Sequence, residues 1–367
     1  MIDGEELRDL HLAEYEGTYL NSAANGLISI ANESFVSDES FKYRKAPGQY
    51  RTDFNTSAVP AIRKQAANLI NANVSEIALI PNFSIGLNLF VKSLPDSFKC
   101  AFYKGDYPSL TMPFVVANFD VKFLEFDNLT VNLDDLELYL QTEKPDLLGL
   151  SHVQWLSGYK ADLESVGILC NQYGCLFLVD ATQSLGASNI DVKNSYIDIL
   201  GASGYKWPLA GFGNGVLYIS EEVMQRYPPL SSGFNSFTLE GNTPVYYPSI
   251  QSVEPGHHDH IAFHKLGFAL AQISELGLEN IILRIRRLMS YLIQELNNAE
   301  IKIIGTFDIN YRAGIICIKS KEGLLKHLES KKIEVSELGE NVRIGVHYYN
   351  NEADIDIFIK EVLLFIR

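Results

Sequence analysis

The chain has 367 residues, of which 47% are hydrophobic and 20% charged, a mix that excludes a disordered protein. At this length we expect two to three domains. There are 30 Lys and Arg against 45 Asp and Glu, a formal charge of −15. Because nucleic-acid binding needs cationic surface, this acidity argues against a nucleic-acid partner and favours small molecules or proteins.

The N-terminus and the cysteines predict a cytoplasmic protein. The opening sequence, MIDGEELRDLHLAEYEG, is acidic and lacks the basic and apolar regions of a signal peptide. No uninterrupted apolar run approaches the ~18–20 residues of a membrane helix, so we expect no membrane partner. The cysteines show no CxxC spacing and lie in or beside apolar stretches, which predicts buried, reduced thiols at Cys100, Cys170, Cys175 and Cys317.

Helical patterns alternate with short apolar runs from about residue 58 to residue 220. The expected helices are residues 57–73, 84–94, 110–119 and 162–174. The expected strands or strand ends are residues 76–82, 99–109, 121–126, 145–155, 174–184, 196–207 and 214–220. This alternation predicts an α/β fold with a mostly parallel sheet covered on both faces.

The pattern loosens over residues 226–256, which are rich in Gly, Ser, Pro and Tyr, and a long helical pattern follows over residues 260–297. Shorter strand and helix patterns then alternate to the end of the chain. We therefore expect a large domain over residues 16–255 and a small α+β domain over residues 256–367. The N-terminal segment, residues 1–15, is expected to pack with the small domain.

Three polar segments follow strands of the expected sheet, where open α/β sheets bind ligands. Asp180 follows five apolar residues, and its carboxylate would be costly to bury unless it has a cationic partner or caps the next helix, ATQSLGA. Lys206 lies among glycines that permit close ligand approach, although a loop lysine is more often a solvated charge. Asn82, Phe83 and Ser84 open a helix whose N-terminus suits a phosphate, or they simply cap it.

Together the three segments have the chemistry that pyridoxal 5'-phosphate requires. An amine can condense with its aldehyde, a carboxylate can keep the ring nitrogen protonated, and a helix N-terminus can hold the phosphate. Each of the three signals is weak alone, and it is their combination along the chain that indicates this cofactor.

The chain resembles the class V aminotransferase family of fold-type I pyridoxal-phosphate enzymes, which includes cysteine desulfurases, selenocysteine lyases, kynureninases and isopenicillin N epimerase-like proteins. The resemblance runs from YLNSAANGLIS to VRIGVHYYNNEADIDIFIKEV, and its most specific parts are VDATQSLGA and SGYKWPLAGFGNGVLY. It implies a large domain with a mostly parallel seven-stranded sheet, a small α+β C-terminal domain and a pyridoxal phosphate cofactor.

The resemblance also implies roles for residues around the cofactor ring. Lys206 matches the lysine that forms the aldimine, and Asp180 matches the partner of the pyridine nitrogen. Gln183 matches a residue that reaches the O3′ of the ring or the lysine, and Gln154 is expected near O3′. Tyr107 matches the aromatic residue that stacks on the ring.

The phosphate is expected to bind residues from two segments and a partner subunit. Ser203 and Tyr205 match the Ser and His of the family's SGHK, and the phenol can donate the same hydrogen bond as the His it replaces. Phe83 and Ser84 match a Thr-Thr pair, so Phe83 can offer only its backbone N–H. His257, in EPGHHDH, aligns with a turn that reaches the partner's cofactor, which implies a homodimer with the active site at the subunit interface.

An amino-acid substrate is implied by Arg343, which matches the arginine that binds the α-carboxylate through its guanidinium fork. A structural salt bridge is the alternative for this residue. Asn25, in SAANGL, falls where the family places a substrate-facing residue.

Four histidines fall in GHHDHIAFH and, with Asp259, have residue types and spacing that could bind a metal. They are His257, His258, His260 and His264. The alignment of this segment with the family's cross-subunit turn argues for a phosphate contact or an ordinary polar turn, so we expect no metal.

The reaction is less clearly indicated than the cofactor. Residues 331–345, where cysteine desulfurases place a reactive cysteine, contain none, and Cys317 lies in an apolar strand pattern. We therefore expect transamination or isopenicillin N epimerase-like epimerisation, with Lys206 as the general base. The alternatives are a cysteine desulfurase-like or selenocysteine lyase-like Cβ–S(e) lyase and, from another class, a non-catalytic protein with this fold.

Overall fold

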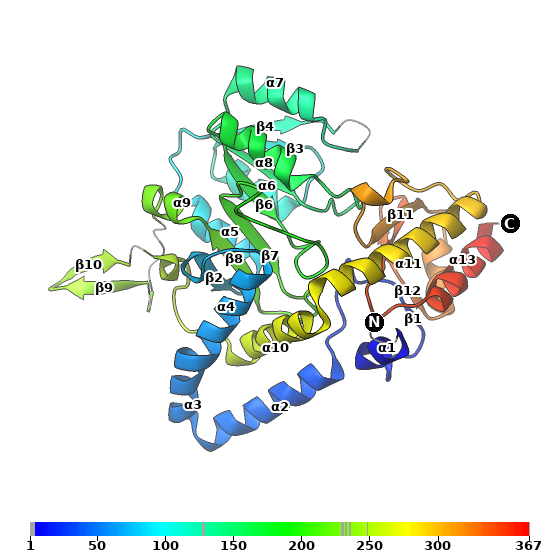
Figure 1. The fold of residues 1–367 in the computed structure, drawn as a ribbon, viewed down its shortest axis with the longest axis horizontal. Helices are drawn as coiled ribbons and strands as arrows, with labels where there is room; N and C mark the ends of the chain where they lie inside the picture. The colour runs from blue at the N-terminus through cyan, green and yellow to red at the C-terminus, as the bar shows by residue number, and fades with distance from the viewer. Residues whose placement is uncertain are drawn as a thin grey trace.

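The computed structural model describes residues 4–366 apart from 127–128, 229–230, 232, 235 and 248. Figure 1 shows a large sheet with helices on both sides and, at the other end of the molecule, a smaller group of elements that includes both ends of the chain. Among the described residues, no single helix has the length and apolar character of a membrane span; only a bent pair of helices does.

The large sheet has seven strands in the order β2-β8-β7-β6-β5-β3-β4. Strand β8 runs antiparallel to both of its neighbours, and the other pairs are parallel, so the mostly parallel α/β architecture predicted from the sequence is confirmed. The strands are β2 (Ile77–Ile80), β3 (Lys99–Tyr103), β4 (Asp120–Leu124), β5 (Leu147–Ser151), β6 (Leu176–Asp180), β7 (Ile199–Ser203) and β8 (Gly215–Ile219).

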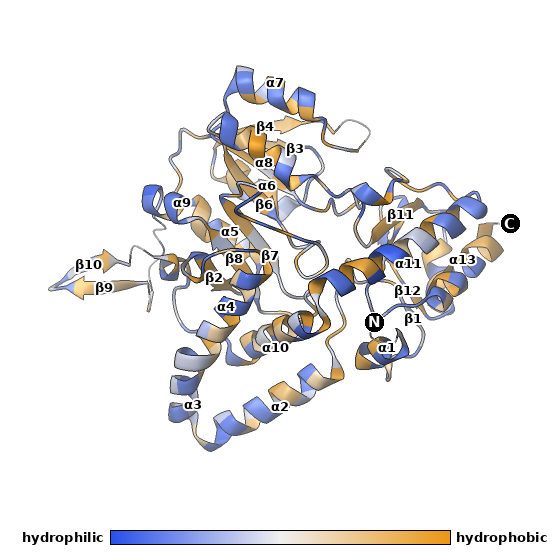
Figure 2. Cartoon of the chain, in the orientation of Figure 1, coloured by the Kyte–Doolittle hydropathy of each residue, from blue (hydrophilic) through white to orange (hydrophobic). Residues whose placement is uncertain are grey.

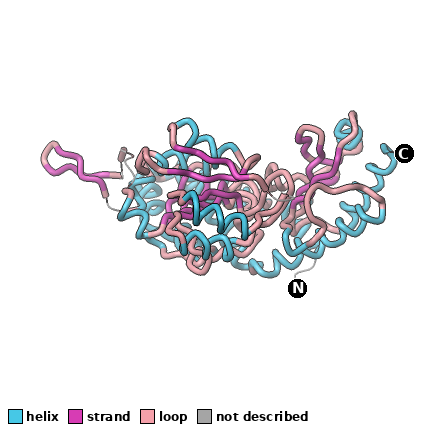
Figure 3. The backbone as a smooth tube through the Cα atoms, turned by 90° about the horizontal axis from the view of Figure 1, so that it is seen from above, coloured by secondary structure: helices cyan, strands magenta, loops and turns pink. Residues whose placement is uncertain are grey.

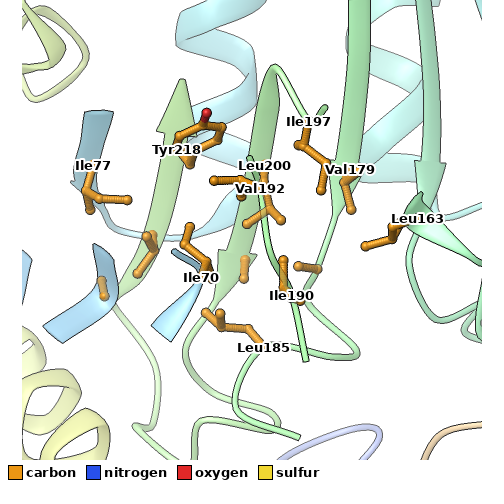
Figure 4. Packing of buried hydrophobic residues seen from close by; sticks show 14 of the residues in the cluster. Ile70, Ile77, Leu163, Val179, Leu185, Ile190, Val192, Ile197, Leu200 and Tyr218 are labelled. Atoms are coloured by element: carbon orange, nitrogen blue, oxygen red, sulfur yellow. The ribbon is translucent and has the colours of Figure 1, made fainter. Parts of the chain in front are cut away.

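Helices cover both faces of this sheet because its central strands are apolar on both sides. One face packs against α4, α7, α8 and α10 in a core that includes Val179, Leu200 and Tyr218 (Figure 4), and the other packs against α5 and α6. The helices of this part are α2 (Ile30–Lys45), α3 (Pro47–Asp53), α4 (Val59–Leu69), α5 (Phe83–Val91), α6 (Pro108–Val116), α7 (Leu133–Glu143), α8 (Leu163–Gln172), α9 (Glu221–Arg226) and α10 (His260–Leu276). Figure 2 shows hydrophobic strands flanked by helices with polar outer surfaces.

The smaller group is built on an antiparallel sheet of β11, β14 and β13, with a short parallel pair of β1 and β12 beside it. Its core also takes Leu7 and Leu12 from the N-terminal helix, and Arg8 pairs with Asp354 at 2.7 Å. The elements are α1 (Gly4–Leu12), β1 (Thr18–Tyr19), α11 (Leu278–Asn298), β11 (Ile315–Lys319), α12 (Leu324–Ser330), β12 (Ile333–Glu334), β13 (Ser336–Leu338), β14 (Asn341–Gly345) and α13 (Glu352–Ile366).

Short helical turns lie within both groups, and one hairpin projects from the body of the molecule. The hairpin of β9 (Phe237–Glu240) and β10 (Thr243–Tyr246) extends away from the large sheet (Figure 3). The short helical turns are η1 (Phe54–Ala58), η2 (Val74–Glu76), η3 (Ile250–Val253) and η4 (Ile309–Tyr311).

Two expected helices are wrong in detail. The single helix expected over residues 260–297 is two helices, α10 and α11, which meet at an angle of 80°. Gly277 ends α10 with a φ of 79°, a conformation that favours glycine. The segment after Asp180, ATQSLGA, forms consecutive turns rather than a helix, so Asp180 does not cap a helix.

Candidate active site

Six of the seven strands of the large sheet end at the same edge, and five of them deliver polar residues of the candidate site there. Strands β2, β3, β5, β6 and β7 all run in one direction, since β8 is antiparallel to both β2 and β7. The segments that follow these five strands carry Asn82, Tyr107, Gln154, Asp180 and Lys206. The sheet therefore brings together residues that are far apart in sequence, as open α/β sheets do at their binding sites.

Lys206 is a buried amine, with 6% of its surface exposed. Its Nζ lies 5.4 Å from the centre of the Tyr107 ring and 5.5 Å from that of the Tyr205 ring. Burial lowers the pKa of Lys206, the charge of Asp180 opposes that shift and the charge of Arg343 adds to it, with a net pKa of about 8. An appreciable minority of this amine is therefore neutral near physiological pH, which makes it a usable nucleophile and base.

Asp180 ends β6 and is 3% exposed. Its Oδ1 accepts a hydrogen bond of 2.8 Å from the backbone N–H of Thr182. Burial raises the pKa of Asp180, Thr182 and Lys206 oppose that shift and the charge of Asp106 adds to it, with a net pKa of about 6. A buried carboxylate of this kind is stabilised by a cation placed beside it.

An anion-binding cradle lies where α5 begins. Asn82 caps α5 through its Oδ1, which accepts from the N–H of Ile85 at 3.0 Å, and Ser203 Oγ accepts from the N–H of Phe83 at 3.0 Å. The hydroxyl of Ser84 donates to Ser109 at 2.8 Å. These residues line a pocket of about 540 Å³ that is also bounded by Pro81, Ile85, Tyr107, Thr182, Tyr205, Phe212 and Gly213. A helix N-terminus with nearby hydroxyls suits a phosphate group.

Aromatic rings wall this part of the site. Tyr205 stacks on Phe212 with ring centres 4.8 Å apart, and Tyr107 meets Trp155 edge-to-face at 5.6 Å. The indole N–H of Trp155 donates to the carbonyl of Gly105 at 3.1 Å, which holds the indole beside Tyr107.

Arg343 reaches the same site from β14 of the smaller sheet. It is 5% exposed, and its Nη1 donates to the Trp155 carbonyl at 3.2 Å. Its Nε is buried and has no hydrogen-bond partner among the described residues. Burial lowers the pKa of Arg343, and Cys317, Tyr107 and Tyr205 oppose that shift. A buried guanidinium with an unsatisfied donor is a ready partner for a carboxylate.

The two glutamines are engaged with their surroundings. The Oε1 of Gln154 accepts from the N–H groups of Leu156 and Ser157, each at 2.6 Å, and its Nε2 donates to Gly105 at 3.1 Å. The Oε1 of Gln183 accepts from the indole of Trp207 at 2.7 Å, next to Lys206 in the chain. Both amides brace loops of the site.

Asn25 lies on an exposed loop that touches the lysine turn. Its neighbour Gly26 donates its N–H to the carbonyl of Tyr205 at 2.8 Å. The backbone carbonyl of Asn25 accepts from the Tyr19 hydroxyl at 2.6 Å. The same loop accepts from Gln183 at the carbonyl of Ala23, 3.0 Å away.

The histidines of GHHDHIAFH have separate partners. His257 stacks on Phe234 at 4.7 Å and His260 on Tyr43 at 4.8 Å. His258 and His264 approach the carboxylates of Glu254 and Glu39 at 3.2 Å and 3.4 Å. Among the described residues, no three His, Cys, Asp or Glu side chains gather as metal ligands would.

The sequence and the fold of this chain are similar to those of known proteins. A sequence model of the family described as "Aminotransferase class-V" matches residues 38–358. The chain belongs to the class V aminotransferase family. It is similar to a probable cysteine desulfurase of Pyrococcus abyssi, with 27% identity over 81% of this chain and 80% of the relative. It is also similar to an uncharacterized aminotransferase of Schizosaccharomyces pombe, with 26% identity over 80% and 78%.

Solved structures share the fold of this class V protein. The apo cysteine desulfurase of Thermococcus onnurineus superposes with a TM-score of 0.91 at 22% identity, over 100% of this chain and 98% of that one. The cystine C–S lyase C-DES, solved with its product cysteine persulfide, has a TM-score of 0.87 at 18% identity, over 96% and 98%. The fold-type I architecture expected from the sequence is therefore confirmed.

The residues of this class V chain fit pyridoxal phosphate. The cradle at α5 offers hydroxyls and a helix N-terminus to a phosphate, and the buried carboxylate of Asp180 has no fixed cation other than Lys206 among the charges that shift its pKa. Lys206 supplies the amine and Arg343 the unsatisfied donor for a carboxylate. The donor set thus matches the aldehyde, ring nitrogen and phosphate of the cofactor.

Sequence reasoning missed three residues of this site. Asp106 is 7% exposed and accepts hydrogen bonds from Ser151 and Tyr107. Trp155 contacts Tyr107 and Arg343, and Thr182 binds Asp180. For Asp106 the signal was present, because an acid soon after the apolar run CAFY resembles the pattern that identified Asp180.

Proposed function

We propose that this class V enzyme uses pyridoxal phosphate to act on an α-amino acid, with Lys206 moving the proton at the substrate Cα. The observation that carries the proposal is the approach of Lys206, Asp180 and Arg343 to one buried site, where their charges influence one another. When bound, the cofactor acts as an electron sink that stabilises negative charge at Cα.

Each residue has a task in this proposal. Arg343 binds the substrate carboxylate with the Nε that lacks a partner, and this orients the Cα bond to be broken. Lys206 Nζ accepts the Cα proton, which its neutral form can do because its pKa is about 8. With the cofactor bound, the carboxylate of Asp180 would keep the ring nitrogen protonated. Tyr107 and Trp155 exclude water from one side.

Transamination and epimerisation both begin with this proton transfer from Cα. With the cofactor bound, Lys206 could return the proton to the cofactor, which would lead to a keto acid; return to the opposite face of Cα, as in epimerisation, would need a proton donor on that face. No further side chain is required for transamination, so the described residues are sufficient for it.

A second candidate, Cβ–S bond cleavage, is favoured by the names of the relatives. A persulfide on the chain's own cysteine is not supported, because all four cysteines are buried and burial raises the pKa of Cys317 to about 11. If this chain cleaves Cβ–S bonds, the form of the chemistry that suits its site does not use a cysteine of the chain. The sulfur instead leaves as part of a small-molecule product or passes to a soluble thiol.

The experiment that tests the proposal begins with borohydride reduction of the purified protein with cofactor. We expect the protein to be yellow and the cofactor to be fixed on Lys206 in peptide mass maps; fixation on another lysine would refute the assignment. Amino acids are then screened for spectral change, and products are sorted into keto acid, opposite enantiomer, or sulfide. A keto acid formed without sulfide, or an enantiomer, supports the first candidate, and sulfide supports the second, whether alanine or a keto acid accompanies it.

The role of Arg343 is tested by Arg343→Gln. We expect KM for the amino acid to rise at least tenfold, since removing a charged carboxylate partner costs about 1.5–3 kcal/mol, with cofactor affinity unchanged. The matched control is Arg287→Gln, an exposed arginine paired with Glu352 at 2.7 Å, which we expect to behave as the unsubstituted protein. An equal fall in cofactor affinity would make Arg343 structural.

A further inference from the structure

Asp106 is a buried carboxylate to which the proposed reaction assigns no role. It lies in the turn between β3 and α6 and is 7% exposed. Its Oδ2 accepts from the N–H of Ser151 at 2.8 Å, and its Oδ1 accepts from the Ser151 hydroxyl at 2.5 Å and the Tyr107 N–H at 2.7 Å. Three such bonds are what a buried carboxylate needs in order to remain ionised.

Asp106 and Asp180 approach each other through Ser151. Ser151 is the register partner of Asp180 on the adjacent parallel strands β5 and β6. The charge of Asp106 raises the pKa of Asp180, in addition to the larger effect of burial. Burial likewise raises the pKa of Asp106, and the bonds from Ser151 and Tyr107 oppose that shift. Two neighbouring buried carboxylates resist joint ionisation unless positive charge lies beside them.

Lys206 supplies one positive charge to this pair, and the protonated ring nitrogen of the cofactor would supply the second. Asp106 is linked by charge to Asp180, on the next strand but one, and Asp180 is linked in turn to Lys206. Tyr107 lies beside Asp106 in the same turn. Arg343 brings a further positive charge to the site, where it acts on Lys206, but it is not among the groups that shift the pKa of Asp106 or Asp180.

We propose that Asp106 is a positioning residue which, acting through Asp180, holds the proton on the ring nitrogen of the bound cofactor. This inference rests on the pyridoxal phosphate dependence proposed above and adds a second counter-ion to it. A residue that only braced the turn would act through its hydrogen bonds, whereas this role depends on the negative charge of Asp106.

The test is Asp106→Asn in the holoprotein, with cofactor labelled with ¹⁵N at the ring nitrogen and observed by NMR across a pH series. Loss of the charge should lower the pKa of the ring nitrogen, weakening its hold on the proton about tenfold for one pKa unit. Cofactor affinity should fall by a similar factor. Affinity for the analogue with carbon in place of the ring nitrogen should stay within about twofold. An unchanged nitrogen signal, or an equal loss for the analogue, would overturn the proposal.

Three variants separate charge from structure. Asp106→Glu keeps the charge and should retain the nitrogen proton, even though the hydrogen bonds are displaced. Asp198→Asn is the matched control, because Asp198 is a half-buried carboxylate that accepts from the N–H of Phe177 at 2.8 Å at the opposite edge of the sheet. Asp198→Asn should change neither the nitrogen signal nor the affinity for the cofactor. In an Asp180→Asn background, Asp106→Asn should shift the nitrogen pKa little, and a full additive shift would contradict action through Asp180.

The test remains decisive if Asp106→Asn does not fold. Asp106→Ser then takes its place, since a hydroxyl can still accept from the Tyr107 N–H, and the same loss of nitrogen protonation is expected. Failure of the proposed function would show as absence of cofactor fixed on Lys206 in the unsubstituted protein. If only the Asp106 proposal fails, the cofactor is still fixed on Lys206, and the nitrogen signal of the Asp106 variant does not change.

Discussion

The amine of Lys206 lies between charges of opposite sign, so its reactivity should depend on pH in a defined direction. Its pKa of about 8 means that the amine is mostly protonated below pH 8 and mostly neutral above it. Only the neutral amine attacks an aldehyde. We therefore expect the rate at which apoprotein captures pyridoxal phosphate, measured by stopped-flow absorbance, to rise with pH through an inflection near 8.

Two substitutions should move that inflection in opposite directions. Asp180→Asn removes a negative charge that raises the pKa of Lys206, so the inflection should move to lower pH. Arg343→Gln removes a positive charge that lowers it, so the inflection should move to higher pH. Arg287→Gln, on the surface, should leave it in place. Shifts of the same sign in both site variants would contradict the electrostatic account.

The sequence alone identified the site residues whose position in the strand pattern indicates their chemistry. Asp180 and Lys206 stand directly at strand ends, and the structure brings both to the edge where ligands bind. Asp106 was not identified from the sequence because its role depends on Ser151, which is 45 positions away in sequence and is adjacent only in the folded sheet. Arg343 was reached through family resemblance, since nothing local in its strand indicates that its Nε lacks a partner.

Among the elements, the loop that contains Gly26 fixes the turn that carries Lys206. A Cβ built at Gly26 would lie 2.0 Å from the carbonyl oxygen of Lys206 and 2.4 Å from a methyl of Leu209, so any side chain displaces the turn. Gly26→Ala should therefore lower the unfolding free energy by about 1–3 kcal/mol and weaken cofactor binding. Denaturant unfolding and a fluorescence titration with cofactor measure the two effects.

Gly48 is the matched position for this prediction. It lies near the start of α3, and a Cβ there would meet nothing within 4 Å. Gly48→Ala should leave cofactor binding unchanged and raise stability by up to about 1 kcal/mol through helix propensity. If the two alanine variants behaved alike, close packing of Gly26 against the lysine turn would not be what holds the site.

The alternation of strands and helices could be read from the sequence because a sheet buried on both faces requires apolar strands. Breaks within long helical patterns could not be read from the sequence in the same way. Residues 260–297 keep helical periodicity on both sides of Gly277, so the pattern predicts one helix. The 80° bend arises because α10 continues from the large-domain core whereas α11 packs on the smaller sheet. Tertiary packing decides such a break.

At the scale of the whole molecule, the phosphate cradle carries less positive charge than a phosphate would be expected to attract. Among the described residues that line it, none is Lys, Arg or His. Hydroxyls and the N-terminus of α5 partly compensate. We expect the missing partner of the phosphate to come from a second copy of this chain, with His257 as a hydrogen-bond donor, because His257 is exposed and lies where family resemblance places a cross-subunit contact.

A mixed dimer tests this expectation directly. Chains with Lys206→Ala are co-expressed with chains carrying His257→Ala, and a different affinity tag on each allows the mixed species to be isolated. If His257 acts on its partner's site, the chain that keeps Lys206 faces an intact His257, and one of the two sites is complete. The mixed dimer should then bind cofactor at that site and show about half the activity of the unsubstituted dimer. If His257 serves its own chain, both sites in the mixed species are defective and activity stays at the level of the two parent variants. A sedimentation mass of a single chain, at concentrations where the cofactor is bound, would also contradict a shared site, because no second copy would then be present to complete the cradle.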